Sequence, residues 1–187
     1  MSSPDPQFVS ASFLPAWAVV SARRRAHIER VTTLLDNWAV EMSLPSAEAD
    51  AWHDAGRWHD ALRDAGADAL RPWVGPQASL PVHAQHGPAA ATRLAAEGET
   101  RHEVLDAIRW HTLGSGTWGR VGHALYLADF LEPGRRFAAE ERAALRALVP
   151  REFARCLRRV VQWRLELALR DGKALFPQTI ALWNAVR

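Results

Sequence analysis

The stretch Ala55-Gly56-Arg57-Trp58-His59-Asp60 decides the expected fold, because it sets a histidine and an aspartate side by side on the apolar face of a helix. His59 lies seven residues after Trp52 and three before Leu62, so it shares the inward-facing stripe of that helix. An adjacent His-Asp pair offers a cation one neutral nitrogen and one anionic oxygen, a donor set that suits hydrolytic metal ions. The pair therefore predicts a metal site inside a helical protein.

The rest of the chain follows the same helical pattern. Apolar residues recur at helical spacing, no segment alternates apolar and polar residues for long, and β-branched residues are sparse. We therefore expect an all-α fold, and a length of 187 residues suits a single domain. Helices are expected near residues 15–42, 46–65, 88–97, 101–110, 119–131, 138–148, 151–171 and 177–186.

Four local expectations accompany this pattern. Pro15 suits the opening turn of the first helix, and Ser46 is expected to cap the second. The stretch from about 66 to 88 is dense in glycine and proline, which predicts an irregular surface loop. Residues from about 173 to 187 are expected to form a C-terminal tail that docks through a short helix.

Composition argues against several classes of protein. The net charge is +2 and the pI is near 9.3, but acids are interspersed with the arginines, so no nucleic-acid partner is expected. The apolar run over residues 13–20 is too short to cross a bilayer, so we expect no membrane partner and a cytoplasmic location. The lone Cys156 cannot form an intramolecular disulfide and is expected to be a buried thiol.

Asp129 is the second anomalous polar residue, because it stands in the apolar run from 124 to 131. A buried carboxylate must be protonated or be paired with a cation or with several hydrogen-bond donors. The nearby histidines suggest a metal as that cation. A cap or a salt bridge to an arginine is the structural alternative.

The order of these residues resembles the HD-domain phosphohydrolases. It runs His27, then His59-Asp60, then His86-Gly87, then His111-Thr112, then Asp129. The segments AIRWHTLG (107–114), LADFLEPGRRF (127–137) and PQTIALWN (177–184) are similar to those of the YqeK-type branch. The resemblance covers residues 14 to 184. It implies a single HD-type helical bundle, over residues 1–187, that hydrolyses diadenosine tetraphosphate symmetrically to two ADP with iron or another divalent metal.

The resemblance also implies roles for particular residues. The matching positions are His27, His59, Asp60 and Asp129 for the primary metal ligands, His86 and His111 for a second ion or the bound phosphate, and Thr112, Gly114 and Arg135 for the nucleotide. Asp60, His86 and His111 are accordingly the expected catalytic residues. His83 is the competitor for the role of His86.

Some positions depart from the pattern of that branch, and they leave the substrate open. Leu113 and Ser115 stand where the branch has a threonine and a basic residue. Arg63 replaces its lysine and Phe176 replaces its histidine. Arg63 keeps the positive charge and offers phosphate oxygens a wider fork of donors.

Phosphate and base contacts are predicted from side-chain chemistry. A guanidinium binds phosphate through two parallel hydrogen bonds, so Arg135, Arg109 and Arg63 are candidate phosphate ligands, each with a structural salt bridge as its alternative. Trp118 lies in the loop 113–118, whose glycines allow close approach of a ligand. We expect it to border a base pocket.

Other histidines receive structural interpretations. A second pair, His53-Asp54, lies six residues before His59-Asp60, about 9 Å along a helix, so the two histidines cannot bind one ion. We assign the metal to His59-Asp60, which leaves His53 solvated or outside the ligand set. His102 and His123 are expected near the surface or behind the ligands.

Three functional hypotheses remain open at this stage. The first is a metal-dependent hydrolase of dinucleoside polyphosphates, in which metal-activated water attacks phosphorus. The second is another HD nucleotidase or phosphodiesterase that acts on mononucleotides or cyclic nucleotides. The third is a metal- and nucleotide-binding regulatory module without turnover. Iron is the expected metal, with manganese, cobalt and magnesium as alternatives, and a homodimer is a further expectation.

Overall fold

A computed structural model of the chain describes residues 13–187, and every regular element in this part is helical. The expected all-α fold is therefore confirmed. The short 3-10 helices are η1 (Gly75–Ser79) and η2 (Val82–Ala84). The α-helices are α1 (Ala22–Glu41), α2 (Ser46–Trp58), α3 (Ala67–Val74), α4 (His86–Ala96), α5 (His102–Trp110), α6 (Arg120–Leu131), α7 (Ala139–Leu148), α8 (Phe153–Arg170) and α9 (Pro177–Val186).

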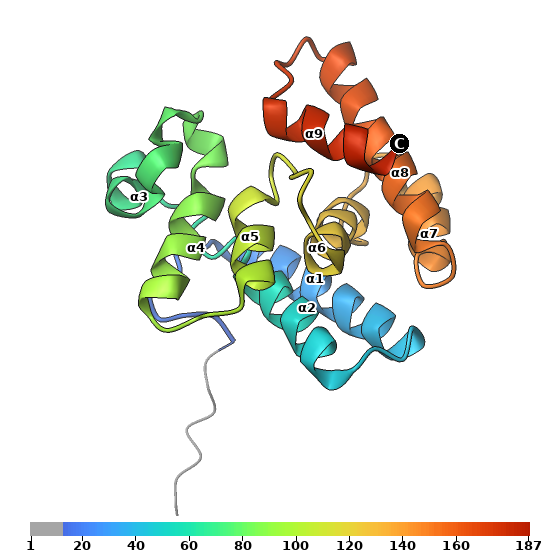
Figure 1. Cartoon of the computed structure of the whole chain (residues 1–187), viewed down its shortest axis with the longest axis horizontal. Helices are drawn as coiled ribbons and strands as arrows, with labels where there is room; N and C mark the ends of the chain where they lie inside the picture. Colours follow the sequence, from blue (N-terminus) through green and yellow to red (C-terminus); the bar gives the residue numbers. More distant parts are fainter. Residues whose placement is uncertain (1–12) are drawn as a thin grey trace, which may run out of the picture.

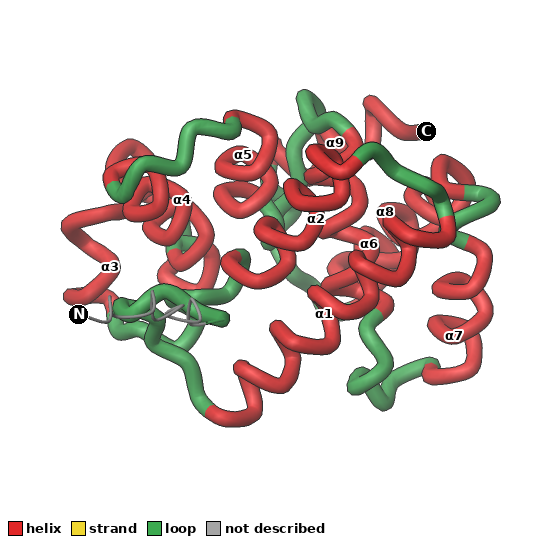
Figure 2. Tube along the Cα trace, turned by 90° about the horizontal axis from the view of Figure 1, so that it is seen from below, coloured by secondary structure: helices red, strands yellow, loops and turns green. Residues whose placement is uncertain are grey.

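The helices form three neighbouring groups (Figures 1 and 2). Helices α1, α2, α5 and α6 lie in the middle, with α3 and α4 on one side and α7, α8 and α9 on the other. The central helices contact one another: α1 packs on α2 and α6, and α5 packs on α2 and α6. Helix α4 packs on α5 and thereby joins this central group.

The first helix starts later than expected. Pro15 lies in a turn, where its carbonyl accepts the N–H of Ala18, and α1 begins at Ala22. Ser21 is the cap, because its backbone is extended and its Oγ accepts the N–H of Arg24. Apolar spacing alone did not locate this cap.

The second helix ends earlier than expected, directly before the His-Asp pair. Residues 59–64 form turns, because the carbonyl of Ala61 accepts the N–H of Val19, and the carbonyl of Val19 accepts the N–H of Asp64. The carbonyl of Ala61 and the N–H of Asp64 therefore bond to Val19 and not to residues of a longer α2. Ser46 is the first helical residue and makes no side-chain cap, so its expected role was wrong.

The expected loop over 66–88 was also wrong in large part, because short helices occupy it. Leu70 and Val74 are buried, and this apolar face holds α3 against α4. Pro72 removes one backbone donor inside α3, and Pro76 stands at the opening of η1, where proline is tolerated. Glycine and proline here separate short helices instead of preventing them.

One cluster of buried apolar side chains joins the central helices. Within it Leu35, Trp52 and Leu125 are inaccessible to solvent. The C-terminal tail packs on the same cluster through the buried Leu182 of α9, as expected, and Cys156 is buried. Among the helices of residues 13–187, none combines the length and the apolar character that a membrane span requires.

Close packing of α1 against α2 depends on Gly56. A Cβ at this position would lie 2.8 Å from Cδ1 of Leu35 and 3.1 Å from the Cα of Thr32. A side chain here would push the two helices apart. The turn that carries His59 and Asp60 would move with α2.

Gly56→Val should therefore lower the free energy of unfolding by about 1–3 kcal/mol, as overpacking in a core does. Gly66→Val is the matched control, because no atom lies within 4 Å of the Cβ it would add. Urea denaturation of both variants measures the difference. Equal stability of the two variants would contradict this packing.

Candidate metal centre

Four histidines and one aspartate meet where the inner ends of the central helices converge. His27 lies in α1, His59 and Asp60 follow α2, His86 opens α4, and His111 follows α5. Each of these side chains is buried: the residues are exposed by 6% or less. The structure thus brings together five of the six side chains predicted as ligands.

Three of the rings are held in the same way by the backbone. Nδ1 of His59 lies 2.7 Å from the carbonyl oxygen of Gly56, that of His86 lies 3.0 Å from the carbonyl oxygen of His83, and that of His111 lies 2.8 Å from the carbonyl oxygen of Ile108. A carbonyl oxygen can only accept a hydrogen bond, so each Nδ1 must donate it. Each neutral ring then carries its lone pair on Nε2.

All of these Nε2 atoms face the carboxylate of Asp60. The Nε2 atoms of His86 and His111 lie 3.0 and 3.3 Å from Oδ1, and those of His59 and His27 lie 3.5 and 3.7 Å from Oδ2. The Nε2 atoms of His86 and His111 are 3.0 Å apart. Those of His27 and His59 are buried and make no hydrogen bond with any described residue.

This donor set fits a divalent cation. Lone pairs that face one another and a carboxylate repel unless a proton or a metal ion lies among them, and imidazole with carboxylate suits Zn²⁺, Fe²⁺ or Mn²⁺. Two groups have donor atoms within 4.8 Å of one another, namely His27, His59 and Asp60 on one side and Asp60, His86 and His111 on the other. Asp60 belongs to both groups, so the arrangement is compatible with one ion or with two.

The charges of the cluster favour cation binding. Burial alone would raise the pKa of Asp60, but the surrounding histidines hold this pKa well below its usual value, so the carboxylate stays ionised. Burial is the main cause that lowers the pKa of His86 to about 4. The neighbouring His111 also lowers this pKa, whereas the carboxylate of Asp60 acts to raise it. His86 is therefore neutral near pH 7 and offers a lone pair.

His27 differs from the other three rings. Burial would lower its pKa, but the carboxylates of Asp129, Glu132 and Asp60 raise the pKa to about 9. Near pH 7 the ring therefore carries a proton, and an ion that binds Nε2 must displace it. A cation bound at Nε2 of His27 would thus replace the positive charge of the displaced proton.

Asp129 contacts both the cluster and arginines. Its Oδ1 lies 3.2 Å from Nε2 of His27 and accepts a 2.7 Å hydrogen bond from Nη2 of Arg135, while its Oδ2 lies 3.7 Å from Nη1 of Arg164. The salt bridge weighed as its alternative is thus present. The carboxylate of Asp129 thus also borders Nε2 of His27.

Glu132 is a site residue that sequence reasoning did not single out. Its buried carboxylate lies 3.3 Å from Nδ1 of His27 and accepts hydrogen bonds from Nε of Arg30 at 2.5 Å and from the N–H of Gly134 at 2.7 Å. Burial would raise its pKa, but these partners lower the pKa to about 2. Its position three residues after Asp129, next to a buried helix end, was the available signal.

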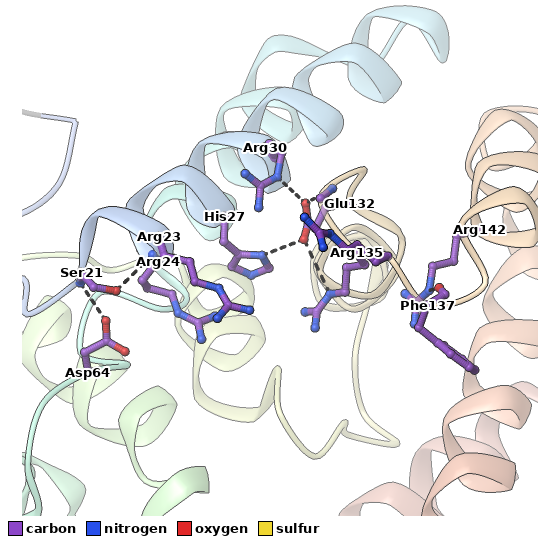
Figure 3. Close-up of a pocket in the computed structure, with 12 residues that line it drawn as sticks. Ser21, Arg23, Arg24, His27, Arg30, Asp64, Glu132, Arg135, Phe137 and Arg142 are labelled. Atoms are coloured by element: carbon purple, nitrogen blue, oxygen red, sulfur yellow. Dashed lines mark hydrogen bonds and ion pairs between the residues drawn. The ribbon is translucent and has the colours of Figure 1, made fainter.

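A pocket of about 990 Å³ opens beside His27 (Figure 3). Arg23 and Arg24 reach into it from α1, and Arg135 and Phe137 line it on the side of the segment after α6. Nη1 of Arg24 lies 2.6 Å from Oδ2 of Asp60, so the pocket reaches the cluster itself. A phosphate in this pocket would lie next to the expected ion.

Trp118, which was expected to border a base pocket, does not line the pocket beside His27. Trp118 is only 8% exposed, packs against Gly122 and Tyr126, and donates to the carbonyl of Asp106. The glycines of its loop make room for α9 instead of a ligand. A Cβ on Gly114 would lie 2.6 Å from Cδ2 of Leu182, and a Cβ on Gly116 would lie 2.9 Å from the carbonyl oxygen of Ala181.

Thr112 and Arg63 lie near the cluster. The hydroxyl of Thr112 is 3.3 Å from Nε2 of His111, and the charge of Arg63 contributes to the low pKa of His86. The half-buried Arg109 lies at the end of α5 and is not among the residues that line this pocket. Arg135 does line it.

The remaining histidines follow the sequence interpretation. His83 is exposed and contributes only its carbonyl, so His86 is the one in the cluster. His53 pairs with Asp36 at 3.0 Å near the surface. His102 is exposed at the start of α5, and His123 packs against Trp118.

The arrangement of the helices is similar to that of a solved structure. A predicted HD superfamily hydrolase involved in NAD metabolism from Clostridium acetobutylicum matches with a TM-score of 0.70 and 20% identity, over 89% of this chain and 90% of that one. No family model matches the chain.

Sequence similarity points to particular enzymes. Over 100 residues, 53% of this chain, it is 27% identical to the symmetrical bis(5'-nucleosyl)-tetraphosphatase of Bacillus subtilis and 29% identical to that of Halalkalibacterium halodurans. The match covers 53% and 52% of those proteins, about half of their length. The resemblance inferred from the sequence is confirmed.

His59→Ala should strongly weaken binding of an ion by His27, His59 and Asp60, because it removes one of the three donor atoms of that group. His53→Ala, in the rival His-Asp pair, is the matched control and should bind metal like the wild type. Elemental analysis of both purified variants checks this. Metal loss in the control, or retention in His59→Ala, would reassign the site.

Glu132→Gln should weaken metal binding about 10- to 100-fold, because a neutral amide holds Nδ1 of His27 less firmly than a carboxylate does. Titration with Mn²⁺ measures the affinity. The melting temperature serves as the control for folding. Unchanged affinity would show that Glu132 only accepts hydrogen bonds from Arg30 and the backbone and does not position His27.

Proposed function

We propose that this protein is a metal-dependent phosphohydrolase that cleaves dinucleoside polyphosphates symmetrically, with diadenosine tetraphosphate giving two ADP. One observation supports the proposal most strongly: the buried His/Asp cluster opens into an arginine-lined pocket that is suited to a polyanion. The two relatives named symmetrical tetraphosphatases support the choice of substrate.

In this proposal His27, His59, Asp60 and Asp129 hold the first ion, and His86 and His111 bind a second ion or the reacting phosphate. A bound divalent ion lowers the pKa of a coordinated water and neutralises charge on phosphate oxygens. The Nε2 atoms of His86 and His111 face the centre, 3.0 and 3.3 Å from Oδ1 of Asp60. Asp60 links the two groups of ligands, which makes it the side chain on which the reaction depends most.

The arginines orient the substrate. Arg24 and Arg135 contact carboxylates of the cluster and line the pocket, so their guanidinium groups are in place for the phosphate next to the bond that breaks. The hydroxyl of Thr112, beside His111, can donate to a phosphate oxygen. Arg63 adds positive charge behind His86.

Iron is the first metal to test, and manganese, cobalt and magnesium are the alternatives, because all accept imidazole or carboxylate ligands. Arg109, Gly114 and Trp118 were assigned to the substrate, but the packing of Gly114 and Trp118 favours structural roles for these two. The single domain, the homodimer and the cytoplasmic location stay predictions.

The metal-loaded protein should convert diadenosine tetraphosphate to ADP alone, without AMP or ATP, because symmetrical attack leaves two equal halves. Chromatography of the products distinguishes the two outcomes. Asp60→Asn should lower kcat at least about 100-fold, since it removes the shared carboxylate.

Two results would contradict the proposal. Cleavage of a mononucleotide or a cyclic nucleotide, with none of diadenosine tetraphosphate, would indicate another HD nucleotidase. Tight binding of metal and nucleotide without hydrolysis under any metal would indicate a binding module.

A further inference from the structure

The arginines that line the pocket fall into two groups. Arg24, Arg30 and Arg135 hold the carboxylates of Asp60, Glu132 and Asp129. Arg142 is buried and donates to the backbone carbonyls of Phe130 and Phe137. These four side chains have partners within the protein, so they contribute charge and shape but are already engaged.

Arg23 and Arg136 form the other group. Both line the pocket and are exposed, and within residues 13–187 neither has an acidic partner. They come from different elements, Arg23 from the first turn of α1 and Arg136 from the segment between α6 and α7. Two unengaged guanidinium groups from separate elements can bind separate phosphates of one chain.

Phe137 gives the same pocket an apolar wall. The residue is 51% exposed, although phenylalanine is usually buried. Its ring lies 6.2 Å from that of Trp163, which supports it on one side. Phe137 lines the pocket and follows Arg136 in the chain, and in Figure 3 it lies beside Arg142. A partly exposed aromatic ring beside phosphate-binding groups is suited to stack on a nucleobase.

We propose that this pocket binds a nucleoside polyphosphate, with the phosphate chain on Arg23 and Arg136 and the base against Phe137. The inference deepens the proposed function, because it assigns the part of the substrate that lies beyond the reacting phosphate. It also moves the base from the loop of Trp118 to the segment after α6.

The test is calorimetric titration of the full-length protein with ADP and with inorganic tripolyphosphate, at one ionic strength. Wild type should bind both. Arg23→Gln combined with Arg136→Gln should weaken both ligands about tenfold or more, because the phosphate contacts are shared. Arg25→Gln is the matched control, since Arg25 is exposed on the same helix and does not line the pocket.

Phe137→Ala distinguishes the contribution of the base to binding from that of the phosphates. It should weaken ADP at least about fivefold, as loss of base stacking does, and leave tripolyphosphate unchanged, which also shows that the variant is folded. The inference would be overturned if the double arginine variant and Phe137→Ala both bound ADP and tripolyphosphate as tightly as the wild type. An equal loss of tripolyphosphate binding in Phe137→Ala or in the Arg25→Gln control would also overturn it.

Ligand affinity tests the assignment of the pocket, and cleavage of diadenosine tetraphosphate tests the proposed function, so the two can fail separately. If the predicted binding pattern appears but diadenosine tetraphosphate is not cleaved, the pocket assignment stands and the hydrolase proposal fails. If cleavage occurs but the affinities of the variants match the wild type, the hydrolase stands and this assignment is overturned.

Discussion

The structure depends on the way in which backbone carbonyls hold three histidine rings. Each carbonyl, three residues before its histidine, accepts a hydrogen bond from Nδ1 of His59, His86 or His111, so Nε2 is the ring nitrogen that faces the cluster. All three Nε2 atoms then face the ionised Asp60 in a buried space. Arg24 and the protonated His27 compensate part of this charge, and a cation bound among the Nε2 atoms would compensate the rest.

Arginines of the pocket are paired with carboxylates of the cluster or next to it. Arg24, Arg30 and Arg135 each join a pocket wall to a carboxylate beside the histidines. Binding at one place therefore changes the electrostatic environment of the other. Such coupling is expected of a site that must hold both a metal ion and a polyanion, whose charges attract each other.

The sequence predicted the helical class, most helix limits after residue 86, and the side chains that meet in the buried cluster, because apolar spacing and buried polar residues are local signals. It did not contain the early end of α2, which depends on backbone pairing with Val19 far along the chain. Trp118 was misplaced because nothing local shows that α9 fills the space near its loop. Glu132 was missed because its partners, His27 and Arg30, lie about a hundred residues away.

Anomalous X-ray diffraction from crystals grown with Mn²⁺ tests the central claim most directly. The account predicts a peak bonded to Nε2 of His59 and to a carboxylate oxygen of Asp60 at about 2.0–2.3 Å, with Nδ1 of His59 still on the carbonyl of Gly56. An empty cluster, or an ion bound elsewhere while Asp60 stays paired with Arg24, would contradict it.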